Sequence, residues 1–457
     1  MSLDGIWKSR GYGWILNISP KGYSLFDTIP GKCVEFECGS REDFDAGFEL
    51  VDPPTEDYIR LSIRNDITHY EFDRITAMPA NVLLLDRPRQ PDPEANLDFF
   101  CRVFAQDYAF FNLRGVDWAN LCEKAGARVS ASTGPEDFFT VLYDLISPLR
   151  DNHVSLCDGS RSVNSEKMAE LKQLIRKELG LKNSMLGDPN NVARIATFIN
   201  REFLGGEAKL AGNSSFLWGM LNASVGYLNI LKLFGIADSA EAKAACDLPP
   251  LKPDHARFLR DDLDAAESIM DQVLTDLGSA DALVLDVRLN GGGFDCVGMA
   301  IANRFADRRR LAFTKHARQD SGCTRQQKFF IEPAGTRQFN RPVYLLTSAR
   351  TASAGDVFAL CMRNIPHVTL VGQPSTGILS DNLMKHLPNG WTTTISNEFY
   401  CSAEGQLFEG PGVPVDFLTP VFVEDDFTRG YHLAVEKACE LARTGGSDRA
   451  HVTDRSQ

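Results

Sequence analysis

The feature that most constrains the fold is a repeated order of apolar run, small-residue turn and helical pattern between residues 225 and 425. An apolar run that is too short for a helix, followed by a turn and a helix, is typical of a parallel β-strand with its crossover. Residues 225–443 are therefore predicted to form an α/β core, with a mostly parallel sheet and helices on both faces. Strands are expected at residues 225–230, 282–288, 342–347 and 368–371, and helices at residues 261–277, 295–306 and 354–363.

The rest of the chain has a different pattern. Residues 1–95 contain short, partly alternating runs separated by Gly, Pro, Asn and Asp, which predicts an all-β domain. A proline-rich stretch at residues 87–93 marks its end. Apolar residues then recur at helical spacing, so residues 96–224 are predicted to form a helical domain. The polar residues 444–457 are predicted to be a disordered tail. In the β domain, strands are expected at residues 13–18, 23–26, 33–38, 58–63, 70–74 and 82–85.

Composition excludes several classes of protein. The 457 residues include 61 acidic and 48 basic side chains, a formal charge of −13, whereas a non-specific nucleic-acid binder needs a basic surface. No run reaches the roughly 18 apolar residues of a membrane helix. The 11 cysteines are odd in number and include no Cys-x-x-Cys pair, which favours thiols in a reducing compartment. Because no apolar leader is visible, we expect a cytoplasmic protein, or an exported one whose leader has been removed.

Two turns follow strands of the predicted core, at the sheet edge where ligands bind in parallel α/β folds. The first is Asn290-Gly291-Gly292-Gly293, and the second contains Ser353 directly before a helix. Free N–H groups at a helix start, with small neighbours beside them, would stabilise an oxyanion next to the serine. Ser353 could equally be an ordinary N-cap, and the glycines could form a flexible turn without a ligand.

A serine nucleophile needs a base, and the chain offers eight histidines. His153 lies in the polar turn Leu149-Arg150-Asp151-Asn152-His153, whereas three others lie in or near strand-like runs and are expected to be structural. Glu409 could orient the histidine as the third member of a triad does, or it could be a solvated loop carboxylate. A zinc site at the His153 turn is disfavoured, because no second histidine stands at ligand spacing.

In this order the segments resemble the tail-specific and C-terminal-processing serine peptidases, which share their core with tricorn protease and the interphotoreceptor retinoid-binding protein repeats. The likeness covers roughly residues 96–425 and leaves residues 1–95 unexplained. It rests on the lead-in from Val116-Asp117-Trp118 to Leu149-Arg150-Asp151-Asn152-His153, the strand Val225-Gly226-Tyr227-Leu228, the run Leu285-Asp286-Val287-Arg288-Leu289-Asn290-Gly291-Gly292-Gly293, the turn Thr351-Ala352-Ser353-Ala354-Gly355-Asp356 and the closing Glu409-Gly410-Pro411-Gly412-Val413.

The resemblance implies a crotonase-like or ClpP-like core and a serine peptidase that requires no metal or organic cofactor. Ser353 would be the nucleophile. The N–H groups of Ala354 and of a glycine in the glycine turn, foremost Gly292, would form the oxyanion hole.

One departure from the family pattern bears on the base. Tail-specific members have a lysine in the turn after the nucleophile, but this chain has Ile378 there, and isoleucine cannot accept a proton. The resemblance then implies the tricorn-like branch, in which His153 is the base and Glu409 matches the glutamate. Asn152 takes the place of that branch's serine and can still hydrogen-bond. The motifs of a PDZ module are missing between residues 157 and 224, so no such module is expected.

Together these residues predict a peptidase of the endopeptidase or carboxyl-terminal-processing type, which acts on a peptide or protein through a Ser-His-Glu acyl-enzyme mechanism. Two alternatives stay open: a non-catalytic ligand- or peptide-binding protein on the same scaffold, and an esterase or amidase. Neither nucleic acid nor a membrane is expected as a partner. The N-terminal β domain could gate the site, bind a partner or form a homo-oligomer, and its sequence decides none of these.

Overall fold

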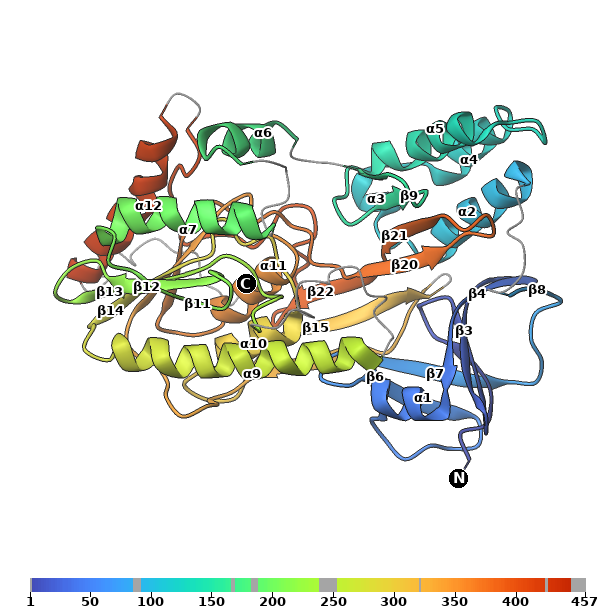
Figure 1. Ribbon diagram of the computed structural model, residues 1–457, viewed down its shortest axis with the longest axis horizontal. Coiled ribbons are helices and arrows are strands. Elements are labelled where there is room, and N and C mark those ends of the chain that lie inside the picture. Colours follow the sequence, from blue (N-terminus) through green and yellow to red (C-terminus); the bar gives the residue numbers. More distant parts are fainter. Residues whose placement is uncertain are drawn as a thin grey trace.

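The computed structural model describes residues 2–84, 92–165, 169–181, 188–237, 253–319, 322–423 and 426–444 (Figure 1). Most of the predicted proline-rich boundary at residues 87–93 and nearly all of the predicted tail lie outside these residues. In the described part, no helix is both long and apolar enough to span a membrane.

A seven-stranded sheet forms the α/β core, in the order β11-β12-β13-β14-β18-β19-β23. The pairings from β13 to β23 are parallel, as predicted, whereas β11 and β12 add an antiparallel edge that was not predicted. The sheet is therefore mixed. Its strands are β11 (Lys209–Ala211), β12 (Phe216–Met220), β13 (Val225–Ile230), β14 (Ala282–Asp286), β18 (Val343–Thr347), β19 (Val368–Gly372) and β23 (Phe417–Leu418).

Helices cover both faces of this sheet, because successive side chains of a strand point to opposite faces. In β14, Leu283 and Leu285 pack in the cluster that contains helices α9 (Pro253–Asp276), α10 (Asp295–Asn303) and α11 (Ala354–Arg363). Ala282 and Val284 of the same strand pack in the other cluster. That cluster contains residues of α6 (Ala169–Glu178), α7 (Pro189–Leu204) and α12 (Phe427–Thr444).

The N-terminal residues form a curled eight-stranded sheet, in the order β5-β6-β7-β1-β2-β3-β4-β8. This confirms the predicted β domain. The prediction missed β1 and β5, together with helix α1 (Arg41–Gly47), which a Ser40–Asp43 capping box begins. The strands are β1 (Gly5–Ser9), β2 (Trp14–Ser19), β3 (Gly22–Ile29), β4 (Lys32–Ser40), β5 (Phe48–Leu50), β6 (Tyr58–Ile63), β7 (His69–Ile75) and β8 (Asn81–Leu83).

The next segment is helical up to Leu149 and is followed by short β-strands. It contains α2 (Pro93–Asp107), α3 (Phe111–Arg114), α4 (Trp118–Gly126), α5 (Pro135–Ile146) and a 3-10 turn at Ser147–Leu149. The hairpin of β9 (Ser155–Cys157) and β10 (Ser162–Asn164) then pairs with β21 (Thr392–Ser396), whose neighbour is β20 (Asn382–His386). The predicted helical domain thus also contains strands. Strand β9 pairs with a strand more than two hundred residues further along the chain, and β10 pairs with β9 in a hairpin.

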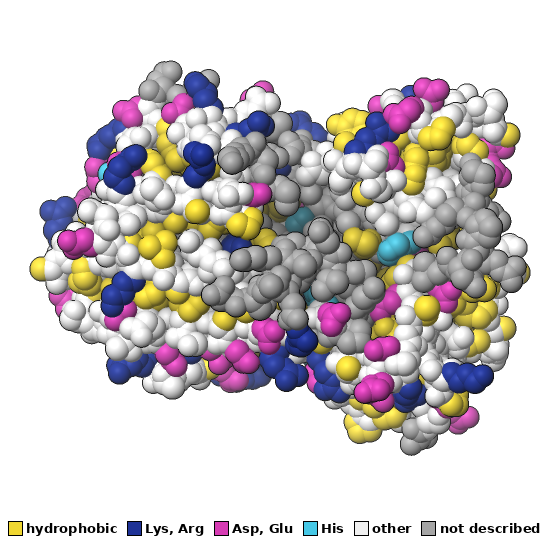
Figure 2. Space-filling view, in the orientation of Figure 1, with side chains coloured by type: hydrophobic (Ala, Val, Ile, Leu, Met, Phe, Trp, Pro, Cys, Tyr) yellow, Lys and Arg dark blue, Asp and Glu magenta, His cyan; other side chains and the backbone are white. Residues whose placement is uncertain are grey.

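A second group of strands connects the core to the N-terminal sheet. Strand β15 (Arg310–Gln319) pairs with β16 (Gly322–Cys323), β17 (Gln327–Ile331) and β22 (Glu398–Ser402). Lys315 Nζ on β15 donates to Thr68 Oγ1 at 2.6 Å, and Tyr12 Oη donates to Glu398 at 2.6 Å. Hydrogen bonds therefore join the N-terminal sheet to these strands, although the surface narrows between the two ends of the molecule (Figure 2).

Candidate active site

Ser353 lies in the turn between β18 and α11. The Gly355 N–H donates to the Ala352 carbonyl at 2.8 Å, and Ser353 has φ 56° and ψ −126°. These are the angles of the first central residue of a type II′ turn, where glycine is preferred. A serine there costs about 1–3 kcal/mol of backbone strain. Its side chain makes no capping hydrogen bond to α11, so the N-cap interpretation does not explain the residue.

A buried carboxylate, Asp356, fixes this turn from inside. It accepts N–H groups from Gly377 at 2.9 Å and Ile378 at 3.3 Å, and a further one from Ser353. Burial raises the pKa of Asp356 to about 6, although the Ser375 side chain and these N–H groups oppose the rise. The nucleophile turn is therefore held against the turn at residues 375–378, where tail-specific peptidases have their lysine.

The glycine turn lies directly against Ser353. A Cβ placed on Gly292 would be 2.7 Å from the Ser353 Cβ, so only glycine fits there. The Gly292 N–H donates to Asn290 Oδ1 at 2.8 Å and is thus already engaged. Gly293 is exposed and lines the same cavity as Ser353. Neither the Gly293 N–H nor the Ala354 N–H has a hydrogen-bond partner among the described residues.

His153 is buried, and its Nδ1 lies 2.5 Å from the Ser380 carbonyl oxygen. Because a carbonyl only accepts hydrogen bonds, Nδ1 carries the proton, which leaves Nε2 with the lone pair that a general base needs. Asp151 shapes the turn by accepting the His153 backbone N–H at 3.0 Å, and Tyr108 Oη donates to Asp151 at 3.0 Å. Half-buried Asn152 lies between these two residues.

Glu409 is buried and holds the backbone next to the histidine. Its Oε2 accepts the N–H groups of Leu379 at 2.8 Å and Ser380 at 3.1 Å, and its Oε1 lies 3.4 Å from Arg114 Nη2. Burial, together with the charge of Asp151, raises the pKa of Glu409 to about 8. No hydrogen bond joins this carboxyl to the imidazole in the described chain, so the two predicted partners meet only through Ser380.

The structure does not join the predicted nucleophile and base directly. Within the described ranges, no hydrogen bond links Ser353 to His153. Catalytic hydrogen bonds are often long in ligand-free enzymes and tighten when substrate binds. The two residues are connected through the chain itself, because Ser380, which binds His153, is followed by Asp381, which lines the cavity with Ser353.

Neither the position of the family's lysine nor the buried Lys315 supplies a base. Ile378 is buried at the position of the family's lysine. Lys315 is also buried. Burial lowers the pKa of Lys315, but the negative charges of Glu398 and Asp381 raise it by more, to well above its ordinary value. The ammonium of Lys315 therefore stays protonated at neutral pH and cannot act as a base.

A cavity of about 240 Å³ lies beside Ser353. The glycine turn and the first residue of α10 form one side, and the segments at the starts of β20 and β22 form another. The N-terminal sheet contributes Tyr12, Trp14 and Tyr70, so this domain helps to build the site. Among the described residues, no cluster of three or more His, Cys, Asp or Glu side chains could hold a metal ion.

Several residues of the site were not found from the sequence. Asp151 belongs to the quoted histidine motif, and Gly293 belongs to the glycine turn, so a closer reading of those motifs could have found them. Ser380 acts through its carbonyl group, which no residue type signals. The aromatic residues of the N-terminal sheet lie more than 280 residues before Ser353 and have no local signal.

A strained serine between a parallel strand and a helix, with free N–H groups beside it, is typical of serine hydrolases. Residues 256–419 match the model of peptidase family S41, and this match bears out the predicted serine peptidase class. The matched range contains Ser353 and Glu409 but not His153.

The fold is also found in solved structures. A conjectured peptidase from Parabacteroides merdae has a TM-score of 0.59 and 20% identity, over 77% of this chain and 97% of that chain. Mature CPAF has a TM-score of 0.52 and 12% identity, over 78% of this chain and 98% of that chain. CPAF complexed with lactacystin gives a TM-score of 0.51 at the same identity and coverage. At these identities the likeness concerns the fold alone.

Proposed function

We propose that this protein hydrolyses peptide bonds through an acyl-enzyme formed on Ser353. The observation that carries the proposal is the strained turn: a serine without a capping role occupies a glycine conformation at the edge of a cavity. Strain of this kind persists where the surrounding structure enforces it, and it concentrates at functional sites. A parallel sheet places such a turn at its carboxyl edge, where substrates bind.

In the proposed reaction, Ser353 Oγ attacks the carbonyl carbon of the scissile bond while His153 Nε2 accepts the hydroxyl proton. The negative charge that develops on the carbonyl oxygen is stabilised by the Ala354 N–H. The second donor is the Gly293 N–H rather than that of Gly292, because Gly292 already donates to Asn290. One such donor is typically worth about 3–4 kcal/mol of barrier.

The second half of the reaction reverses the proton transfer. The C–N bond breaks, and His153 gives its proton to the leaving amine, which leaves an ester between Ser353 and the acyl part of the substrate. Water then attacks the ester with the imidazole again as base, and Ser353 regains its proton. The Ser380 carbonyl holds the imidazole in the required tautomer throughout.

Glu409 and Asn152 serve as positioning residues in this proposal. Glu409 holds the backbone of Ser380, whose carbonyl in turn orients His153. Since Ile378 replaces the lysine and a histidine takes its role, we place the enzyme with the tricorn-like branch and relate it to the retinoid-binding repeats. The absence of a PDZ module and a cytoplasmic location stay predictions, and so does the crotonase-like or ClpP-like character of the core.

Labelling with a fluorophosphonate tests the nucleophile directly. We expect the protein to be labelled at Ser353 and the Ser353→Ala variant to remain unlabelled while its circular dichroism is unchanged. Ser348, which donates to the Arg288 carbonyl and is fully buried, is a matched control position, because Ser348→Ala should leave labelling intact. Labelling that persists in Ser353→Ala would refute the mechanism. Digestion of a peptide library then separates a peptidase from an esterase or amidase.

A second candidate is a non-catalytic binding protein on the same scaffold. It is favoured by one observation, the lack of a hydrogen bond between Ser353 and His153 among the described residues. Such a protein would bind peptides without cutting them and would resist the fluorophosphonate. Hydrolysis that depends on both Ser353 and His153 would exclude it.

A further inference from the structure

We propose that the cavity beside Ser353 binds a positively charged group of the substrate, such as the side chain of lysine or arginine close to the scissile bond. The cleavage step rests on the proposed function, but binding of the cation can be measured without turnover. Three features of the wall support the proposal: its carboxylates, its aromatic rings and a buried amide oxygen that has no partner.

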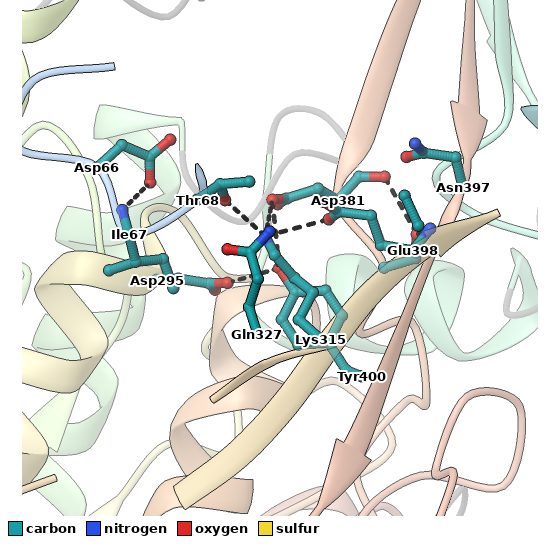
Figure 3. Close-up of polar contacts among 12 residues, drawn as sticks. Asp66, Ile67, Thr68, Asp295, Lys315, Gln327, Asp381, Asn397, Glu398 and Tyr400 are labelled. Atoms are coloured by element: carbon teal, nitrogen blue, oxygen red, sulfur yellow. Dashed lines mark hydrogen bonds and ion pairs between the residues drawn. The ribbon is translucent and has the colours of Figure 1, made fainter. Parts of the chain in front are cut away.

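Four carboxylates line the cavity, and they come from different parts of the chain (Figure 3). Asp66 follows β6, Asp295 begins α10, Asp381 precedes β20 and Glu398 begins β22. Burial, with the charge of Asp381 added, raises the pKa of Asp66 to about 6. Burial also raises the pKa of Glu398 to about 7, although Lys315 opposes the rise. For both groups burial is the largest cause of the shift, and the neighbouring Asp381 carboxylate adds to it.

One lysine opposes these carboxylates. Lys315 Nζ lies 3.3 Å from Asp381 and 3.2 Å from Glu398, and Tyr400 and Thr68 are also within hydrogen-bond distance of it. The ammonium of Lys315 therefore already has four partners among the groups around the cavity. Figure 3 shows these groups gathered around Lys315.

The remaining carboxylates are not neutralised by other cations. Asp66 and Asp295 make no ion pair with any described residue. Two histidines line the cavity, but burial lowers the pKa of His255 to about 4, so it is neutral at pH 7. His386 already pairs with Asp27 at 2.8 Å. The cavity is therefore lined by four carboxyl groups and, among the described residues, by no lysine or arginine, although burial raises the pKa of Asp295 well above its ordinary value.

Aromatic rings from the N-terminal sheet form another part of the wall. The ring centroids of Tyr12 and Trp14 are 5.4 Å apart, those of Tyr12 and Tyr70 are 4.8 Å apart, and those of Trp14 and Tyr70 are 5.2 Å apart. Faces of aromatic rings attract cations, and trios of rings beside carboxylates bind ammonium groups in other proteins. An anionic group would be repelled by the carboxylates, and a purely aliphatic group would gain only hydrophobic contact with the rings.

The third feature of the wall, which does not depend on charge, is the buried amide of Asn397. It lines the cavity and is 1% exposed. Its Nδ2 donates to the Gly11 carbonyl at 2.9 Å, which fixes the direction of the amide, while its Oδ1 has no hydrogen-bond partner among the described residues. A buried acceptor without a partner costs free energy. Ammonium and guanidinium groups only donate, so a cation that reached this oxygen would satisfy it.

The test compares two N-acetylated peptides that differ only in arginine against citrulline, which has nearly the same shape but no charge. We expect kcat/KM to be at least about tenfold higher for the arginine peptide, the ratio that one charge-assisted hydrogen bond provides. Asp66→Asn should reduce this ratio severalfold. The new amide can still accept the Ile67 N–H that Asp66 binds at 2.6 Å, so the turn is expected to fold.

Asp45→Asn is the control, because Asp45 is an exposed carboxylate of the same domain that does not line the cavity. It should leave the ratio unchanged. The same peptides without the N-acetyl group show whether a free terminal ammonium serves as the cation in place of a side chain. Equal kcat/KM for the arginine and citrulline peptides, or a ratio that Asp66→Asn does not alter, would overturn the inference.

Binding measurements keep this inference separate from the proposed function. Fluorescence anisotropy of labelled peptides with Ser353→Ala should show tighter binding of the arginine peptide, whatever the catalytic outcome. If the protein resists the fluorophosphonate but binds arginine over citrulline, the proposed function fails and the cation site stands. If it is labelled but binds both peptides equally, the enzyme stands and the cation site fails.

Discussion

The strain at Ser353 makes a quantitative prediction, because it can be removed by a single substitution. A non-glycine residue at φ 56° and ψ −126° costs about 1–3 kcal/mol, and glycine adopts such angles freely. Against this, glycine increases the entropy of the unfolded chain, which costs about 0.4–1 kcal/mol relative to alanine. The balance predicts that Ser353→Gly is about 1 kcal/mol more stable than Ser353→Ala, while both variants are inactive.

Urea unfolding, followed by tryptophan fluorescence, measures the difference in the free energy of unfolding between the two variants. The same unfolding transition is compared in both. Ser132 is a suitable control, because it is exposed and is not among the residues with positive φ. At that position glycine should be less stable than alanine by about 0.4–1 kcal/mol. If Ser353→Gly were also the less stable of its pair, the turn would not be strained, and the main support for a functional serine would be lost.

Three further predictions concern the base, the glycine turn and pH. His153→Ala should lower kcat by about 10²–10⁴-fold in a peptidase assay, whereas His255→Ala should retain most of the activity; the opposite result would assign the base to His255. Gly292→Ala should abolish activity and lower the thermal midpoint, because the new Cβ would lie 2.7 Å from that of the nucleophile at φ 105°. Since burial raises the pKa of Asp66 to about 6 and of Glu398 to about 7, their stabilising contribution is complete below about pH 4 and is lost as pH rises through these values. Binding of an arginine peptide should strengthen over the same range, and a pH-independent affinity would contradict this.

The parallel core was the part of the fold that the sequence predicted best, because its signal is local. Strands such as Val225–Ile230 are continuous apolar runs bounded by turns. The strands that were missed have no such pattern. Lys209–Ala211 and Ser155–Cys157 are three residues long, and they are strands only because partners supply hydrogen bonds, the following strand β12 for the first and the distant β21 for the second. Pairing of this kind depends on tertiary structure and leaves no trace in a short window.

In the site, too, features with a local sequence signal could be predicted, whereas features that depend on tertiary contacts could not. Ser353 and the glycine turn each follow a core strand, so the sequence could predict that they meet at one edge of the sheet. The role of Glu409 could not be derived in full, because its partners are backbone N–H groups at residues 379 and 380 rather than the imidazole. The availability of the Gly292 N–H as an oxyanion donor depends on the rotamer of Asn290, whose side chain accepts that N–H here. The residue type alone does not reveal the rotamer.

The segment from Leu379 to Asp381 connects catalysis with substrate binding. Its carbonyl at Ser380 fixes the tautomer of His153, and Glu409 holds its N–H groups. The next side chain, Asp381, is 55% exposed and lies in the wall of the cavity. A backbone that is held on one side by a buried carboxyl can shift only as a unit, so a movement of Asp381 toward a bound cation would also move the carbonyl that orients the imidazole. In the proposed mechanism, charge recognition in the cavity and alignment of the base would therefore be coupled through Ser380 and Asp381.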